Sequence, residues 1–272
     1  MIVDFHTHIF PDKIAEKTIS TLAKASNSLP HTNGTVEGLC AQVEKAKIDL
    51  AIALPVLTKP EQFDSVLRFA TIVNENYYNG KSKVLSFAGI HPKCQDIAGK
   101  MKQIKELGFK GVKIHPQYQD TFIDDSGYEQ ILFCAKEQDL IVVTHAGVDD
   151  GYKDSPVMCP PDKTAKLIDK VNHDKFVLAH YGGNRQWEDV IKYLVGKKVY
   201  FDTSYILNYI PSDIFYEILE KHGENKILFA TDCPWRDIST EVERLKKLIP
   251  QKEKQEKIFG ENAKKLLNME KL

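Results

Sequence analysis

Short apolar runs alternate with longer amphipathic runs along the whole chain. The apolar runs are rich in β-branched and aromatic residues, a composition typical of buried strands. Eight strands are expected, at about residues 2–5, 49–54, 84–90, 111–115, 140–145, 176–180, 198–202 and 226–232. Apolar residues recur at helical spacing in the segments between them, at 14–25, 39–47, 63–78, 101–107, 125–138, 161–171, 187–195 and 211–221, and again from about residue 240.

Strands that alternate with helices imply parallel pairing, and eight such units predict an α/β fold of the (β/α)8, or TIM-barrel, type. A doubly wound sheet is the alternative, and it usually carries a glycine-rich turn after its first strand. Here that place holds His6-Thr7-His8, which favours the barrel. No linker, repeat or low-complexity segment interrupts the alternation. We therefore expect a single domain over residues 1–272, with the last helices as a C-terminal cap.

The composition is that of an ordinary soluble globular protein, with 42% hydrophobic and 28% charged residues among 272. The 37 basic and 38 acidic side chains nearly cancel, so no attraction to nucleic acid or to a membrane surface is expected. The five cysteines are scattered and never form a CxxC pair, which favours reduced thiols and a cytoplasmic location. A homodimer is the default expectation for the assembly.

Histidines gather where the predicted strands end. In a barrel, the carboxyl ends of the strands meet at one face and carry the working groups. Six of the nine histidines, one lysine and one aspartate fall at or just past these ends: His6, His8, His91, His115, His145, His180, Lys113 and Asp232. The other three, His31, His173 and His222, are expected at the surface. This convergence predicts an active site at one end of the barrel.

The types of residue indicate a metal site. His6 and His8 lie two positions apart, so their imidazoles point the same way from an extended chain. With His145 and Asp232 they would form an N3O site that leaves a position for water. A divalent ion there lowers the pKa of bound water toward about 7, and Asp232 could carry the proton to a leaving group. His180 could bind a second metal, act as a base or polarise the substrate.

The chain resembles the amidohydrolase superfamily over nearly its whole length. The motifs that carry the resemblance are Asp4-Phe-His6-Thr-His8, His145, His180, residues 228–235 and the closing segment 258–267. The closing segment is similar to the last helix of the subgroup that includes aminocarboxymuconate semialdehyde decarboxylase and related lactonases. The resemblance implies a metal held by His6, His8, His145 and Asp232, with His180 beside it.

Lys113 leaves open whether one or two metals bind. Residues 111–116 resemble the fourth-strand segment of dihydroorotase-type members, in which the lysine is carboxylated and bridges two metals; His180 would then be a ligand of the second. Lys113 would face the barrel interior if Val112 and Ile114 face the helices. Decarboxylase-like members generally use one metal and lack this lysine. An ammonium group beside a metal is repelled, so Lys113 is expected either as a carbamate or turned toward an anionic substrate.

Residues on the loops after the strands are expected to line the substrate pocket: His91, His115, Tyr118, Tyr181, Arg185 and Trp235. Arg185 and Lys113 would suit a small substrate that carries a carboxylate. The expected function is that of a metal-dependent hydrolase acting on an amide, a lactone or an ester-like carbon. The alternative is a metal-dependent, non-oxidative decarboxylase of an unsaturated or aromatic acid. Zn²⁺ fits the expected ligands, and Mn²⁺, Fe²⁺ or Co²⁺ fit nearly as well.

Overall fold

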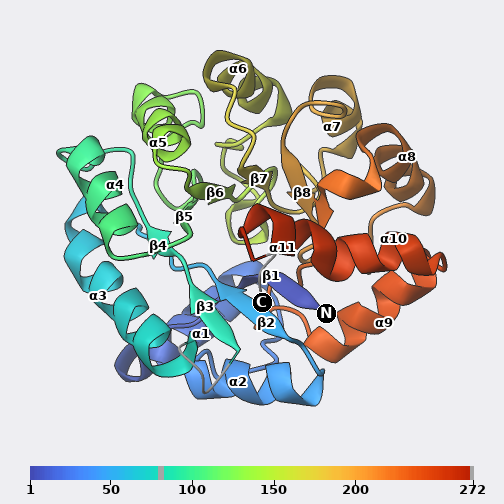
Figure 1. Cartoon of the computed structure of the whole chain (residues 1–272), viewed down its shortest axis with the longest axis horizontal. Coiled ribbons are helices and arrows are strands. Elements are labelled where there is room, and N and C mark those ends of the chain that lie inside the picture. Colours follow the sequence, from blue (N-terminus) through green and yellow to red (C-terminus); the bar gives the residue numbers. More distant parts are fainter. Residues whose placement is uncertain (79–82, 270–272) are drawn as a thin grey trace.

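Parallel strands surrounded by helices make up the computed structural model, which describes residues 1–78 and 83–269 (Figure 1). The strands are β1 (Val3–Thr7), β2 (Leu50–Ala53), β3 (Val84–Ser86), β4 (Ala88–Gly89), β5 (Gly111–Ile114), β6 (Ile141–Thr144), β7 (Phe176–Leu178), β8 (Tyr200–Asp202) and β9 (Ile227–Leu228). They form two parallel sheets, in the orders β1-β2-β3 and β4-β5-β6-β7-β8-β9.

Helices follow the strands in the predicted alternation. They are α1 (Asp12–Ser26), α2 (Val36–Lys45), α3 (Phe63–Val73), α4 (Ile97–Glu106), α5 (Ser126–Glu137), α6 (Pro161–Val171), α7 (Trp187–Tyr193), α8 (Ser212–His222), α9 (Ile238–Leu248), α10 (Lys252–Glu256) and α11 (Asn262–Leu266). Short 3₁₀ or π turns are η1 (Pro60–Gln62), η2 (Asn74–Tyr78), η3 (Asp150–Tyr152), η4 (Glu224–Lys226) and η5 (Lys257–Glu261). None of the helices in the described part of the chain is long and apolar enough to cross a membrane.

The two sheets meet at both of their edges. On one side, β3 pairs with β2 and β4 pairs with β5, so the predicted strand at 84–90 links the sheets across the interruption at Phe87. On the other side, backbone hydrogen bonds join β1 to the segment after β9, with Phe5 N donating to Phe229 O (2.9 Å) and Asp232 N to His6 O (2.8 Å). The strands therefore occupy eight positions around a ring, and the predicted (β/α)8 architecture is confirmed.

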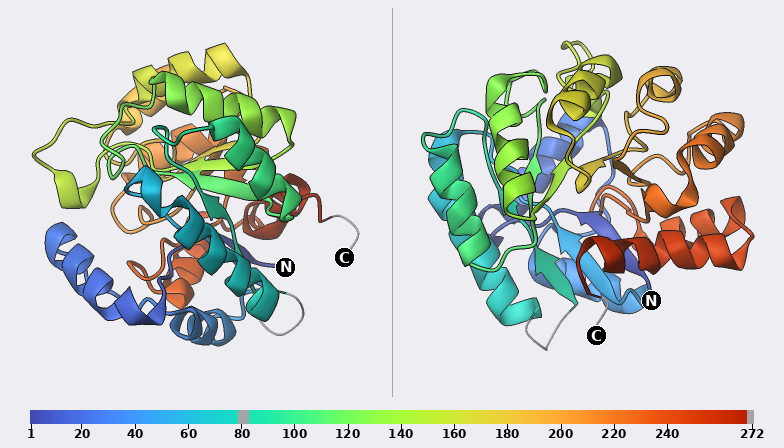
Figure 2. Two further views of the ribbon diagram at one scale, coloured as in Figure 1. Left: turned by 90° about the vertical axis from the view of Figure 1, so that its left-hand side faces the viewer. Right: turned by 45° about the horizontal axis from the view of Figure 1, so that its top comes forward.

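Apolar side chains fill two layers, one inside the ring of strands and one between the strands and the helices. Phe5, Ile52 and Val143 belong to the inner layer, together with Ala263 and other residues at the C-terminal end, so α11 packs against one end of the barrel. Figure 2 (left) shows α1 and the loop after β6 at the opposite end, away from both termini. This arrangement leaves the carboxyl ends of the strands open for a site.

Two histidines that were expected at the surface are buried, so that prediction was wrong for them. Nε2 of His173 donates to the carbonyl oxygen of Leu140 (2.9 Å), and the residue is only 4% exposed. His222 contacts Val199 O through Nε2 (3.0 Å) and stacks on the ring of Phe201. Both are satisfied by backbone carbonyls, which allows an imidazole to be buried without a charge partner.

Candidate active site

The side chains at the strand ends converge on one cavity of about 800 Å³. Its floor is formed by the residues that the strand ends were predicted to supply: His6, His8, Lys113, His115, His145, His180 and Asp232. Tyr118 and Trp235 also line it. Among the described residues, His91, Tyr181 and Arg185 lie outside the lining.

A β-bulge at the end of β1 directs His6 into the cavity. The register with β2 changes between Asp4, opposite Ala51, and Thr7, opposite Ala53, so three steps along β1 match two along β2. Strict alternation would place Phe5 and His6 on opposite sides of the strand, yet Phe5 packs in the barrel interior and His6 lines the cavity. Bulges commonly re-aim a side chain beside a functional site in this way.

His6, His8 and Asp232 form a cluster of hydrogen-bond acceptors. Nδ1 of His6 lies 2.9 Å from the Asp202 carboxylate, and Nδ1 of His8 lies 3.0 Å from the carbonyl of Leu54, so each Nδ1 carries the hydrogen and donates. The Nε2 lone pairs of the neutral rings then face each other at 3.2 Å. They lie 3.6 and 3.1 Å from Oδ1 of Asp232. Nζ of Lys113 lies 3.1 Å from Nε2 of His6. Nε2 of His8 and Oδ1 of Asp232 nevertheless remain acceptors that face each other, an arrangement that favours an added cation.

The spacing of these three atoms fits a divalent ion. Metal–nitrogen and metal–oxygen bonds of about 2.0–2.2 Å in a tetrahedral site place neighbouring ligand atoms roughly 3.3–3.6 Å apart. The observed separations of 3.1, 3.2 and 3.6 Å lie within or about 0.2 Å below that range. His6, His8 and Asp232 could therefore hold a metal through two nitrogens and one oxygen, as proposed from the sequence.

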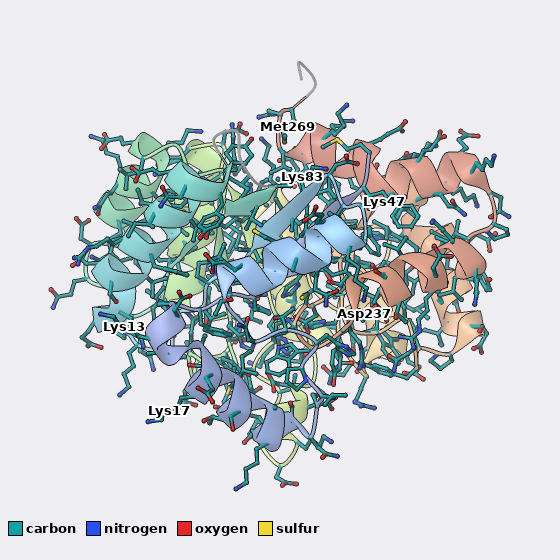
Figure 3. All side chains as sticks on the ribbon, turned by 90° about the horizontal axis from the view of Figure 1, so that it is seen from below. Lys13, Lys17, Lys47, Lys83, Asp237 and Met269 are labelled. Carbon is teal, nitrogen blue, oxygen red and sulfur yellow. The ribbon has the colours of Figure 1, made fainter. Side chains whose placement is uncertain are left out.

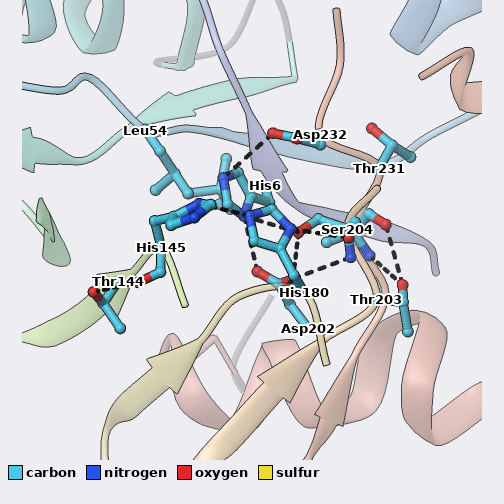
Figure 4. Close-up of polar contacts among 12 residues, drawn as sticks. His6, Leu54, Thr144, His145, His180, Asp202, Thr203, Ser204, Thr231 and Asp232 are labelled. Atoms are coloured by element: carbon cyan, nitrogen blue, oxygen red, sulfur yellow. Dashed lines mark hydrogen bonds and ion pairs between the residues drawn. The ribbon is translucent and has the colours of Figure 1, made fainter. Parts of the chain in front are cut away.

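Asp202 orients His6 and was not identified from the sequence. Its carboxylate is fully buried; Oδ2 accepts from Nδ1 of His6, and Oδ1 accepts from the backbone N–H of His180 and of Ser204, both at 3.0 Å (Figure 4). A carboxylate behind a ligating imidazole fixes its tautomer and increases its basicity. The available signal was the position of Asp202 at the end of a predicted strand, on the same face as the histidines.

His145 and His180 form a second hydrogen-bonded pair. Nδ1 of His180 donates toward the carbonyl of Ser204 (3.1 Å), so its Nε2 accepts from Nδ1 of His145 at 3.0 Å. This leaves Nε2 of His145 as a buried lone pair with no partner among the described residues. The structure does not bring His145 into the cluster of His6, His8 and Asp232, although His145 lines the same cavity.

His145 also belongs to a second group of possible ligands, together with His115 and Asp149. The rings of His115 and His145 are stacked, with centroids 4.4 Å apart and planes inclined by only 11°. A metal binds an imidazole nitrogen in the plane of the ring, and one ion cannot lie in two nearly parallel planes. In this arrangement the group is a stack of rings, continued by Tyr118 on the other face of His115, rather than a metal site.

Lys113 points into the barrel, as expected, because Val112 and Ile114 belong to the outer apolar layer. Its Nζ is buried and lies 3.1 Å from Nε2 of His6. Burial lowers the pKa of Lys113 to about 8, although the carboxylates of Asp202 and Asp232 act in the opposite direction. The amine therefore remains largely protonated at neutral pH, directly beside the acceptor cluster.

Two further aspartates line the cavity and were missed, since both follow the predicted strand by several residues. Burial raises the pKa of Asp149 to about 6, and its Oδ2 lies 3.6 Å from Nε2 of His115. Asp150 accepts from Nε of Arg185 (3.1 Å) and from the hydroxyl of Tyr205 (3.1 Å). Arg185 is therefore paired with Asp150, and it does not itself line the cavity.

Two other residues that were predicted to line the pocket, His91 and Tyr181, contact other parts of the protein instead. Nδ1 of His91 accepts from the backbone N–H of Lys93 at 3.1 Å, within its own loop. Tyr181 is fully buried and stacks on Phe215, with centroids 5.1 Å apart.

The chain is similar to known proteins both in sequence, through a family model, and in fold, through solved structures. A family model described as "Amidohydrolase" matches residues 97–269. No curated protein sequence matches the chain. Three solved structures share its fold at low identity. A 5-carboxyvanillate decarboxylase from Sphingomonas paucimobilis has 13% identity and a TM-score of 0.69, with 98% of each chain covered.

The other two are also decarboxylases. A 2,6-dihydroxybenzoate decarboxylase from Rhizobium has 15% identity and a TM-score of 0.69, again with 98% of each chain covered. A dihydroxybenzoic acid decarboxylase from Polaromonas sp. JS666, with bound manganese and the inhibitor 2-nitroresorcinol, has 15% identity and a TM-score of 0.71. That similarity covers 100% of this chain and 98% of the other.

Proposed function

The chain belongs to the amidohydrolase family, and from this premise we propose that it is a metal-dependent, non-oxidative decarboxylase of an aromatic or unsaturated carboxylic acid. The sequence favoured hydrolysis and kept decarboxylation as the alternative. Three enzymes that share the fold across almost the whole chain are named as decarboxylases of hydroxylated aromatic acids, which supports the alternative. The ion could be Mn²⁺, as in the Polaromonas structure, or Zn²⁺, which suits the nitrogen and oxygen donors.

The observation that carries the proposal is the acceptor cluster of His6, His8 and Asp232 at the floor of the cavity, with the buried amine of Lys113 beside it. This lysine is a feature that decarboxylase-like members generally lack, and it offers a cation to the substrate carboxylate. A carboxylate substrate loses its hydration when it enters the cavity, so it requires cationic partners at the floor to offset that cost. Lys113 can provide one, because its Nζ lies at the floor, 3.1 Å from Nε2 of His6. An ion bound at Nε2 of His6 would displace the amine from that nitrogen and leave it to the substrate carboxylate. Arg185 cannot provide another, since it is paired with Asp150 and does not line the cavity. The second positive charge is then assigned to the ion that His6, His8 and Asp232 would hold.

Decarboxylation breaks one carbon–carbon bond and leaves its electron pair on the ring or alkene carbon, which must gain a proton as carbon dioxide departs. When bound, a divalent ion would supply Lewis acidity toward the oxygens of the substrate. Asp232 is suited to carry the proton. Burial raises the pKa of Asp232, but the neighbouring imidazoles of His8 and His6 outweigh it, so the pKa lies below its ordinary value. The ionised carboxylate can accept a proton from a substrate hydroxyl and return it to carbon.

Hydrolysis is the second candidate, because the family model is described as "Amidohydrolase" and the same acceptor cluster could support water activation. The two reactions differ in their products. Hydrolysis adds the elements of water across an amide, lactone or ester bond and releases no carbon dioxide.

The experiment begins with the metal content of protein purified without chelators. About one ion per chain is expected for the single cluster, whereas about two would favour a carbamate at Lys113 and a ligand role for His180. Metal-loaded protein is then incubated with hydroxybenzoic acids labelled with ¹³C at the carboxyl group. Labelled carbon dioxide should appear with the wild type and not with Asp232→Asn. Hydrolysis of lactones or amides, with no labelled carbon dioxide from any acid, would show that the proposal is wrong.

A further inference from the structure

The cavity is much larger than its catalytic floor. Its volume of about 800 Å³ lies toward the upper end of the roughly 300–1,000 Å³ found for small-molecule sites. A hydroxybenzoate bound at the strand ends would leave most of that space empty. The remaining wall is supplied in part by α1, which lies at the open end of the barrel, and by one side of α3, which belongs to the ring of helices around the strands.

One side of α1 faces this outer part of the cavity. Ile14, Thr18, Leu22 and Ser26 recur at four-residue intervals and all line it. Twelve residue steps at 1.5 Å give this stripe a length of about 18 Å, far longer than a benzoate ring. The adjacent line of α1, with Ala15 and Ile19, is buried against the rest of the protein. Figure 3 shows α1 at the edge of the molecule opposite Met269, with Lys13 and Lys17 labelled on it.

The facing side of α3 is also uncharged. Ser65, Val66 and Phe69 line the cavity, and the charged residues of α3, Asp64 and Arg68, do not. Lys13 is the only charged side chain that α1 and α3 contribute to the lining in the described part of the chain, and it is exposed. The outer part of the cavity is thus an apolar groove with a few hydroxyl groups, continuous with the charged floor.

We propose that this groove binds an apolar extension of the substrate, so that the enzyme acts on acids with an alkyl or aryl chain remote from the carboxyl group. The inference rests on the proposed function for the position of the carboxyl group. A polar floor that opens directly into a largely apolar groove matches a molecule with a chelating head and an apolar tail. Burial of the tail removes apolar surface of both groove and substrate from water, which favours binding.

The test compares resorcinol with 4-hexylresorcinol, which share a head and differ by a hexyl chain, by isothermal titration calorimetry on the metal-loaded protein. Each buried methylene strengthens binding by about fourfold, so a mostly buried chain should make 4-hexylresorcinol bind at least roughly 30-fold more tightly than resorcinol. Leu22→Asp should reduce this advantage to less than about threefold, because a carboxylate in the groove must be desolvated. Ile14→Asp is the second variant; its side chain is 50% exposed, so the fold should tolerate it.

Leu29→Asp is the matched control, because Leu29 is 76% exposed, follows α1 and does not line the cavity. It should leave both affinities unchanged. Failure of 4-hexylresorcinol to bind, or undiminished binding by Leu22→Asp, would overturn the inference. So would a dimer that Ile14→Asp dissociates while the preference for the hexyl chain persists, because α1 would then serve a second copy of the chain. If short acids release carbon dioxide but the hexyl chain does not strengthen binding, the role of the groove is wrong and the proposed reaction stands. If the hexyl chain strengthens binding but no acid releases carbon dioxide, the proposed reaction is wrong and the role of the groove stands.

Discussion

Replacing Asp202 by asparagine tests whether metal binding depends on the group behind His6. The carboxylate accepts four hydrogen bonds: from Nδ1 of His6, from the backbone N–H groups of His180 and Ser204, and from the Ser204 hydroxyl. An asparagine has one acceptor oxygen. If that oxygen keeps the two backbone donors, the amide NH₂ faces Nδ1–H of His6, and two donors oppose each other.

His6 can avoid this conflict by moving its hydrogen to Nε2, the atom that faces the metal cluster, or by donating to the Ser204 hydroxyl, 3.2 Å from Nδ1. In either case the imidazole loses its charged partner. Hydrogen bonds to a charged partner contribute about 1.5–3 kcal/mol, and loss of a group that orients a metal ligand typically costs 10–100-fold in metal affinity. We therefore expect Asp202→Asn to bind Zn²⁺ or Mn²⁺ roughly 10–100-fold more weakly than the wild type.

The assay is competition for the metal with a chromogenic chelator at pH 7.5, with circular dichroism to verify the fold. Glu241→Gln is the matched control, because Glu241 is a fully buried carboxylate on α9 that does not line the cavity. It should leave the metal affinity unchanged. A folded Asp202→Asn variant whose affinity stays within about threefold of the wild type would refute the orienting role of Asp202.

Three further outcomes are expected. His6→Ala should lose most of the bound metal, measured by elemental analysis, and full metal content would remove His6 from the cluster. Burial lowers the pKa of His222 from 6.5 to about 4. As the pH falls, His222 is therefore protonated in the unfolded chain before it is protonated in the folded one. The free energy of unfolding should then decrease by roughly 2 kcal/mol between pH 7 and pH 5, and urea titrations of a His222→Gln variant should lack this share of the decrease. Tyr181→Ala should destabilise the fold by about 3–5 kcal/mol, because Tyr181 is a core residue, whereas Tyr181→Phe should cost only about 1 kcal/mol; calorimetry that showed no loss for Tyr181→Ala would contradict this assignment.

Local sequence signals were sufficient for the elements and their order. Helix α6 begins at Pro161 and ends at Val171, as predicted, because proline is favoured in a first turn and Asn172 adopts the left-handed conformation that ends a helix. The predicted strand at 84–90 is divided at Phe87 into β3 and β4, each paired with a different neighbour. Apolar periodicity reports burial, and it does not report such an interruption.

The position of residues at strand ends was also sufficient to bring His6, His8 and Asp232 together. The carboxyl ends of parallel strands meet at one face of a barrel, so order along the chain translates directly into proximity there. The same reasoning placed Lys113 inside the barrel, because side chains alternate along a strand. It could not place Arg185 or Tyr181, which follow β7 on a loop whose path the sequence pattern does not describe.

The sequence by itself determined the barrel, the face that carries the chemistry and the residue types gathered there. Only the tertiary structure decided which polar group meets which. Asp202 accepts a hydrogen bond from His6, 196 positions away in the sequence. Arg185 pairs with Asp150, and the carbonyl of Val199 accepts a hydrogen bond from the buried His222. A hydrophobic pattern is set by each segment separately and can be recognised locally. A hydrogen bond across the barrel depends on strand register, a bulge and loop paths together, and these exist only once the whole chain is packed.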